Sequence, residues 1–168
     1  MKKNFLRLLT FCCVFISIPS FSAESSSVSV SGRVESSTCV ISADSRNMTI
    51  TFPDITYERA ATAGTLATQN YKINLSDCPL SQNVVSLKFS GTPDTINSGK
   101  AYANSGTAKN VAVEIVTSYN SEMGNQKSSA LTIVNQKATF DLIASLVSRG
   151  NATAGTILIN VTGEVVYN

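Results

Sequence analysis

The stretch GTILINVTGEVVY, residues 155–167, has the most regular pattern in the chain and decides the fold class. Apolar residues or glycine occupy every second position, namely Gly155, Ile157, Ile159, Val161, Gly163, Val165 and Tyr167. Alternation with a period of two predicts a β-strand with one face in a core. A strand of about 13 residues would span about 43 Å, which is longer than most strands of a single domain.

This terminal strand has two interpretations. It is either a central strand with one buried face, or a strand whose free edge is offered to a partner. The second interpretation is the sharper one, because no later segment of this sequence is left to cover a long apolar edge.

Similar alternation recurs along the chain between clusters of turn-forming residues. Further strands are predicted at residues 27–34, 38–43, 48–52, 70–75, 84–90, 111–119, 130–134 and 138–147. No stretch of eleven or more residues keeps an apolar stripe with a period of 3.6, so we expect helices to be short or absent. The pattern therefore predicts an all-β chain, folded as a two-sheet, immunoglobulin-like sandwich.

The first 22 residues predict a secretory signal peptide. Three basic residues precede an apolar run at residues 8–18, and small residues follow it, which favours cleavage after Ser22 or Ala23. The apolar run is too short to span a membrane. The whole chain has 13 basic and 11 acidic residues. Without the predicted signal peptide it has ten basic and 11 acidic residues, and no run of basic residues remains. We therefore expect no nucleic-acid partner.

Two of the four cysteines, Cys12 and Cys13, belong to the predicted signal peptide. The remaining pair, Cys39 and Cys78, most simply forms one disulfide in an exported protein, and two free buried thiols are the alternative. Closing a loop of about 40 residues contributes about 4 kcal/mol in the chain-entropy treatment of the unfolded state. The disulfide would thus supply a large part of the stability of a small domain.

The residue types argue against catalysis. The chain contains no histidine, which excludes Ser-His-Asp and Cys-His arrangements and the usual zinc sites. The acidic residues are scattered singly, and no phosphate-binding glycine loop is present. We expect no enzyme activity, cofactor, metal ion or small-molecule substrate. A sugar-binding surface of exposed aromatic residues around Tyr102 or Tyr119 is a remaining alternative.

The segment before the first cysteine also alternates. Val28, Val30, Gly32 and Val34 share one parity and are preceded by small polar residues. This pattern fits a first strand of the chain's own sheet, and it fits equally well a strand that is offered to another molecule.

Several motifs resemble the pilin subunits of the bacterial chaperone-usher pathway, the type 1 fimbrial family. GRVESSTC sets Gly32 seven residues before Cys39, and INLSDCP places Cys78 at the end of a strand. LKFSGTPD and GTAKNVAVEI have similar forms in short members of the family. Gly155 stands fourteenth from the end and Tyr167 is penultimate, as in the family's C-terminal signature.

The resemblance implies an immunoglobulin-like sandwich that lacks its last strand and has an open groove. In this family a periplasmic chaperone lends a strand to the groove, and the N-terminal extension of the next subunit replaces it at an outer-membrane usher. The donor positions would be Val28, Val30, Gly32 and Val34. The edge from Gly155 to Tyr167 would be the chaperone contact and one wall of the groove.

The implied organisation is a signal peptide at residues 1–22, a donor extension at 23–35 and a pilin domain at 36–168. The implied partners are a chaperone, an usher and neighbouring subunits, and the route leads through the periplasm to a surface fimbria. Similarity to adaptor members favours a minor subunit, with a shaft subunit nearly as plausible. The alternative function is a carbohydrate-binding adhesin, although family adhesins carry an additional domain for which this chain has no room.

Overall fold

The computed structural model describes residues 38–167 except Ile96 and Ser98, all within a compact unit of residues 36–168. The predicted signal peptide and the whole expected donor segment lie outside the described residues. Within the described ranges, no helix has the length and hydrophobicity needed to cross a membrane.

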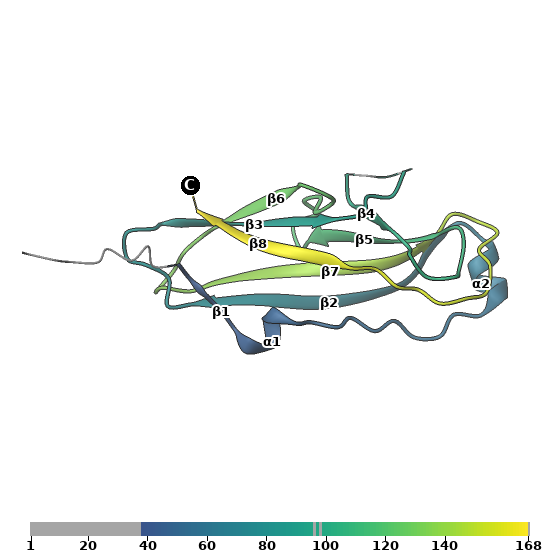
Figure 1. Cartoon of the computed structure of the whole chain (residues 1–168), viewed down its shortest axis with the longest axis horizontal. Helices are drawn as coiled ribbons and strands as arrows, with labels where there is room; N and C mark the ends of the chain where they lie inside the picture. Colours follow the sequence, from purple (N-terminus) through teal and green to yellow (C-terminus); the bar gives the residue numbers. More distant parts are fainter. Residues whose placement is uncertain (1–37, 96, 98, 168) are drawn as a thin grey trace, which may run out of the picture. The chain divides into compact units, whose positions relative to one another are not determined.

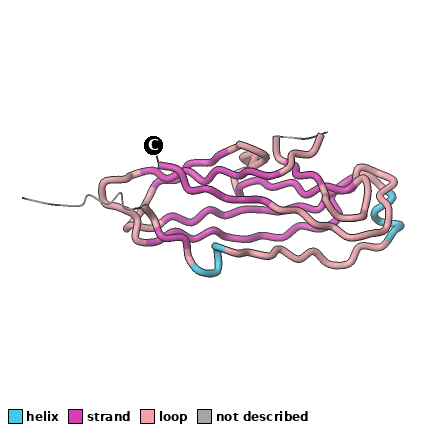
Figure 2. The backbone as a smooth tube through the Cα atoms, viewed as in Figure 1, coloured by secondary structure: helices cyan, strands magenta, loops and turns pink. Residues whose placement is uncertain are grey.

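Two antiparallel sheets form the unit (Figure 1). The five-stranded sheet has the order β1-β2-β7-β5-β4, made of β1 (Val40–Ile41), β2 (Gly64–Ser76), β7 (Ala138–Ser148), β5 (Val111–Thr117) and β4 (Ala101–Ala103). The three-stranded sheet has the order β6-β3-β8, made of β6 (Ser128–Thr132), β3 (Val84–Gly91) and β8 (Val161–Tyr167). Two helices of a single turn, α1 (Ala43–Arg46) and α2 (Tyr57–Ala61), complete the described elements, and Figure 2 shows how little helix there is. This architecture is an incomplete immunoglobulin-like sandwich, as expected.

The core lies between the two sheets and follows the alternation of the strands. On β7, Phe140, Leu142 and Leu146 are each no more than 1% exposed, whereas Asp141 on the opposite parity forms an ion pair with Lys72 at the surface. Burial of apolar side chains on one face is the main force that holds such a sheet to its partner. The period-two pattern therefore identified the inward faces correctly.

One predicted strand is not formed, and one strand of the structure was not predicted. Residues 48–52 do alternate, with Ile50 and Phe52 packed against the core, but no ladder pairs them with another strand among the described residues. Residues 101–103 lie outside the predicted strands, yet they form β4, which pairs with β5. The alternation reports which face is buried, whereas a ladder also needs a neighbouring backbone.

The terminal strand is also shorter than predicted, because β8 begins only at Val161. Residues 156–158 bind the loop 104–108 instead: the Ala108 N–H donates to the Thr156 carbonyl at 3.1 Å, and the Ser105 N–H donates to the Leu158 carbonyl at 2.9 Å. Gly155 has a φ of +154°, and a Cβ there would lie 2.5 Å from the Ala108 nitrogen. Only glycine allows this close approach. The strand therefore does not begin at Gly155 as predicted, because the residues after Gly155 are bonded to the loop 104–108.

The predicted disulfide between Cys39 and Cys78 is confirmed. It joins the beginning of the described chain to the end of β2. The neighbouring turn between β6 and β7 has Asn135 and Gln136 at positive φ, as a two-residue hairpin of type I′ requires. The Cys78 N–H donates to the Gln136 carbonyl at 3.0 Å, so this turn and the loop after β2 lie side by side.

Candidate functional site: a groove beside the last strand

A groove of about 1050 Å³ opens between the sheets of the described domain. One wall is the segment from Gly155 to Gly163, and the other is the segment 48–55 with the helices that flank it. In Figure 1 the strands β2 and β7 are visible between β8 and the long connection that follows α1. The groove thus lies where a further strand could be added beside β8.

The floor of the groove is the hydrophobic core itself. Its lining side chains come from both sheets and include Leu66, Ile73, Leu87, Phe89, Val113, Ile115 and Leu146. The rim also carries large apolar side chains, because Met48, Ile157 and Leu158 are exposed. Apolar surface concentrated in one concave site marks a place where another chain binds.

The wall formed by β8 has a free backbone edge within the described residues. β8 pairs with β3 over seven residues, from Val161 opposite Gly91 to Tyr167 opposite Val85, and with no other described strand. An unpaired edge leaves a row of N–H and C=O groups that a strand from another molecule can satisfy. The long connection after α1 likewise offers extended backbone that no described ladder uses.

Glycine at position 163 lets β8 approach β3 closely. Gly163 stands opposite Phe89, and a Cβ there would lie 2.9 Å from a ring carbon of that buried side chain. The ring of Phe89 therefore occupies the space that a larger residue in β8 would need. Gly163 also lines the groove, so the absence of a side chain widens the groove at this point.

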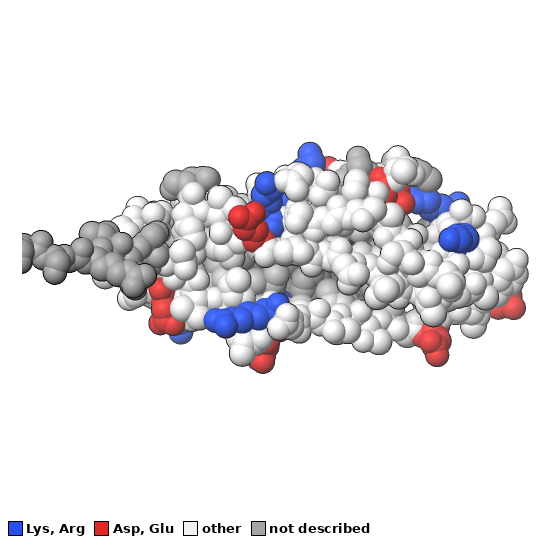
Figure 3. Space-filling model, in the orientation of Figure 1, with Lys and Arg blue, Asp and Glu red and all other residues white. Residues whose placement is uncertain are grey.

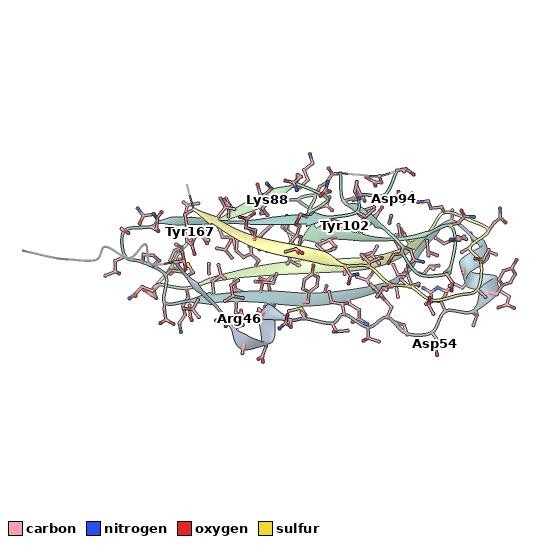
Figure 4. All side chains as sticks on the ribbon, viewed as in Figure 1. Arg46, Asp54, Lys88, Asp94, Tyr102 and Tyr167 are labelled. Carbon is pink, nitrogen blue, oxygen red and sulfur yellow. A yellow bond between two sulfur atoms is a disulfide. The ribbon has the colours of Figure 1, made fainter. Side chains whose placement is uncertain are left out.

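The end of β8 is tied to the disulfide. The Cys39 N–H donates to the Tyr167 hydroxyl at 2.6 Å, and Figure 4 shows Tyr167 at the end of β8, near the yellow bond of the disulfide. The chain therefore enters the described domain beside the last residues of β8.

Two tyrosines lie inside this framework. Burial, with a smaller contribution from Tyr102, raises the pKa of Tyr71 on the floor of the groove, and its hydroxyl has no hydrogen-bond partner among residues 38–167 that the structure describes. Burial also raises the pKa of Tyr102 to about 12. The Tyr102 hydroxyl donates to the Met123 carbonyl at 2.8 Å, and its side chain is fully buried. Both rings serve the core, so Tyr102 cannot belong to a sugar-binding surface.

Charges play a small part in the groove. Figure 3 shows a few scattered Lys, Arg, Asp and Glu side chains on this face, with mostly uncharged surface between them. The best-shielded ion pair, between Arg149 and Asp94, lies outside the groove lining. The described part of the chain contains no cluster of acidic or cysteine side chains that could hold a metal ion.

The expected edge residues divide into two groups. Gly155, Ile157, Ile159, Val161 and Gly163 line the groove, whereas Val165 and Tyr167 pack against the core farther along β8. The connection at residues 48–55 was not expected as the opposite wall. Its alternation was visible in the sequence, but the pairing of two distant segments across a groove was not.

An incomplete sandwich with an apolar groove beside its last strand defines the class of pilin subunits. The model of the family described as Fimbrial protein matches residues 28–168. The chain belongs to this family of chaperone-usher pilins, whose members are structural subunits and not enzymes. It is thus a subunit of a chaperone-usher fimbria, and the predicted family is confirmed.

The chain is similar in sequence to other fimbrial proteins over nearly its whole length. The chain is 30% identical to the uncharacterized fimbrial-like protein YdeR of Escherichia coli, covering 96% of this chain and 95% of that protein. It is 28% identical to the minor fimbrial subunit HifD of Haemophilus influenzae, covering 96% and 82%. It is also 29% identical to the S-fimbrial adhesin protein SfaS of Escherichia coli, covering 96% and 98%.

The fold agrees with solved pilin structures. The P pilus rod subunit PapA matches with a TM-score of 0.68 at 18% identity, covering 79% of this chain and all of that chain. A subunit in the structure of a chaperone-usher pilus matches with a TM-score of 0.69 at 16% identity, covering 90% and 100%. Both matches therefore support the pilin fold of this chain.

Proposed function

We propose that this chain is a minor, adaptor-type subunit that joins two neighbours in a fimbria by donor-strand exchange. One observation carries the proposal: the groove beside β8 exposes the core and a free strand edge within the described residues. Such a groove accepts an extended segment that alternates between apolar and small residues. The similarity to HifD, a minor fimbrial subunit, supports the position of the chain within the fibre.

The segment that this chain would donate is residues 23–35, with Val28, Val30, Gly32 and Val34 facing the neighbour's core. Each valine removed from water contributes about 1.5 to 3 kcal/mol. The backbone of the donor would also complete the ladder of the neighbour's last strand, so that few polar groups remain unpaired.

Before assembly, we propose that a periplasmic chaperone occupies the groove and pairs with the edge of β8, and that an outer-membrane usher exchanges it for the next subunit. The exposed apolar rim of the groove supports a protected intermediate, because a free subunit with this surface would self-associate. This route leads through the periplasm to the cell surface.

The test substitutes two adjacent donor positions of opposite parity. Val30→Asp should leave the subunit's own chaperone complex intact but block its incorporation into fimbriae, because a carboxylate would enter an apolar groove. Ser29→Asp is the matched control, since its side chain would point away from the neighbour's core, and it should assemble normally. Equal amounts of fimbrial Val30→Asp and wild-type subunit, measured by immunoblot of sheared fibres, would refute the donor assignment.

The edge assignment has its own test. Deletion of residues 166–168 should abolish capture by the chaperone, because β8 would lose the end that is tied to Cys39. Glu164→Gln, an exposed position on the same strand, is the control and should be captured like the wild type. Unchanged periplasmic yield of the truncated chain would remove the claim.

The similarity to SfaS keeps the adhesin function as a second candidate. Of the two tyrosines expected at a sugar site, Tyr102 is buried and Tyr119 is 84% exposed. One exposed ring offers less contact than a platform of several, which favours the structural role. Loss of receptor binding by fimbriae that carry Tyr119→Ala, with normal fibre length, would instead favour the adhesin.

A further inference from the structure

We propose that residues 77–83 and 133–137, here called the collar, pack against the end of the neighbouring pilin subunit whose groove receives this chain's N-terminal segment. The inference rests on the proposed function and adds a second contact surface to it. The occupant of the collar is a subunit of the same fold, at the end of that fold which carries α2 in this chain.

The collar is built from two connections held side by side. Its hydrogen bonds run from the Cys78 N–H to the Gln136 carbonyl at 3.0 Å and from the Ile133 N–H to the Asn83 carbonyl at 2.9 Å. The turn is closed by a pair of bonds between Val134 and Lys137 at 2.9 and 3.0 Å. The collar is therefore a fixed part of the domain.

Two large apolar side chains project from the collar into solvent. Leu80 is 84% exposed and Val134 is 62% exposed, and the two hydrogen bonds between the connections bracket both positions. A single exposed apolar residue is ordinary on a protein surface, whereas two on adjacent rigid turns form a site for contact. The collar carries one acid, Asp77, and one base, Lys137, so its charge opposes neither an acidic nor a basic neighbour.

The position of the disulfide indicates which molecule contacts the collar. Cys78 lies in the loop after β2 and is bonded to Cys39, so the described chain begins beside the collar. Figure 1 shows this end of the strands β2, β3, β6 and β7 together with the end of β8. Any molecule that holds the N-terminal segment is therefore held close to Leu80 and Val134.

The connection between the donor segment and the described domain limits how far the neighbouring subunit can lie from this domain. If the donor ends at Val34, four Cα steps remain before Thr38, and a fully extended connection spans at most about 14 Å. A groove that holds Val34 must end within that reach of Thr38. This distance is too short for the two domains to stay apart, because each is several times wider than the connection is long.

The opposite end of the fold supplies the complementary surface. A fibre that grows without closing requires contact between two different ends of its subunits. In this chain the end remote from the collar carries α2, where Tyr57 is exposed, and the loop at residues 149–152 that bonds to α2. A neighbour of the same fold presents the counterparts of these residues to the collar.

Photocrosslinking in assembled fimbriae tests the collar. A benzophenone side chain would be placed at Leu80, at Val134, at the donor position Val30 and, as a control, at Thr68 in the middle of β2, whose hydroxyl lies 3.2 Å from that of Ser145 on the outer face of the sheet. We expect the Leu80 and Val134 probes to crosslink the same subunit as the Val30 probe, and the Thr68 probe not to crosslink it.

The outcomes separate the two proposals. If the Val30 probe captures a pilin while the Leu80 and Val134 probes capture nothing, or a different protein, the collar proposal is wrong and the donor assignment stands. Equal capture of that pilin by the Thr68 probe would also overturn the collar. If the Val30 probe captures no pilin, the proposed function fails and the collar proposal fails with it.

A second measurement uses substitutions. The double variant Leu80→Ser, Val134→Ser should shed from fibres in urea on the order of tenfold faster than the wild type, since about 1.4 kcal/mol of contact corresponds to that factor. Thr68→Ala, in the middle of β2 on the outer face of the sheet, is the control and should shed at the wild-type rate. Both variants should bind the chaperone normally, because no core residue changes. Identical shedding of the double variant and the wild type would contradict the proposal.

Discussion

The backbone N–H of Cys39 donates a hydrogen bond of 2.6 Å to the hydroxyl of Tyr167. The two residues are 128 positions apart in the sequence, and the bond joins the entry of the chain to the end of its last strand. The same end of the domain therefore holds the disulfide, the point from which the N-terminal segment departs and the end of β8. This relationship gives Tyr167 a structural role as well as a place on the strand edge.

Removal of the Tyr167 hydroxyl should weaken this junction. We expect Tyr167→Phe to lower the free energy of unfolding by about 1 kcal/mol, because the Cys39 N–H would lose its acceptor while it remains partly buried. Urea unfolding of the mature chain measures the change. Tyr119→Phe is the control, and equal stability of the two variants would show that the hydrogen bond contributes nothing.

A side chain at position 163 should disturb the packing of β8 on β3. Gly163→Ala would place a methyl group 2.9 Å from the ring of Phe89, so we expect a loss of about 1 to 3 kcal/mol in unfolding free energy. The double variant Gly163→Ala, Phe89→Leu makes room for the methyl group. Its loss of unfolding free energy should therefore be smaller than the sum of the losses in the two single variants. Strict additivity of the thermal midpoints would contradict the proposed clash.

The ion pair between Arg149 and Asp94 should be strongly coupled. Both side chains are mostly buried, and the Nε atom of Arg149 has no partner among the described residues. Arg149→Met should therefore cost about 3 kcal/mol, because it removes the guanidinium from a mostly buried ion pair. Adding Asp94→Asn should recover part of this loss in a double-mutant cycle, and a coupling energy near zero would show that the pair is unimportant.

Stability should fall at alkaline pH. The pKa of Tyr102 is raised to about 12 and that of Tyr71 is raised as well, so the unfolded chain releases these protons at lower pH than the folded chain. The free energy of unfolding is therefore fully retained below pH about 10 and declines as the pH rises towards 12. Tyr71→Phe should flatten this decline in urea titrations, whereas Tyr119→Phe should keep the wild-type profile. A wild-type stability that does not change between pH 9 and pH 11 would contradict the prediction.

Most of the sequence prediction rested on the alternation of apolar and polar residues within single strands. In the predicted strands 70–75 and 138–147 the apolar parity includes Tyr71, Ile73 and Phe140, and each of these residues lies in or against the core. The disulfide followed from two cysteines that remain in an exported chain, and the structure contains it. Local signals of this kind are readable because the side-chain period of a strand depends only on its own backbone.

The ends of the strands and the second wall of the groove could not be predicted from this alternation. Gly155, Ile157 and Ile159 continue the alternation of β8, yet their segment binds the loop 104–108 instead of extending the ladder. The competing bonds come from Asn104 and Thr107, about fifty residues away in the sequence. A pattern within one segment contains no information about such a distant partner.

The sequence by itself determined the class of fold, the inward face of each strand and the pair of cysteines, because these depend on the period of a strand and on the chemistry of exported thiols. Only the tertiary structure decided that β8 leaves one edge free among the described residues, that a groove of about 1050 Å³ opens beside it, and that the collar is joined by the disulfide to the beginning of the described chain. These features arise where segments far apart in sequence meet, so their physical cause is the packing of the two sheets.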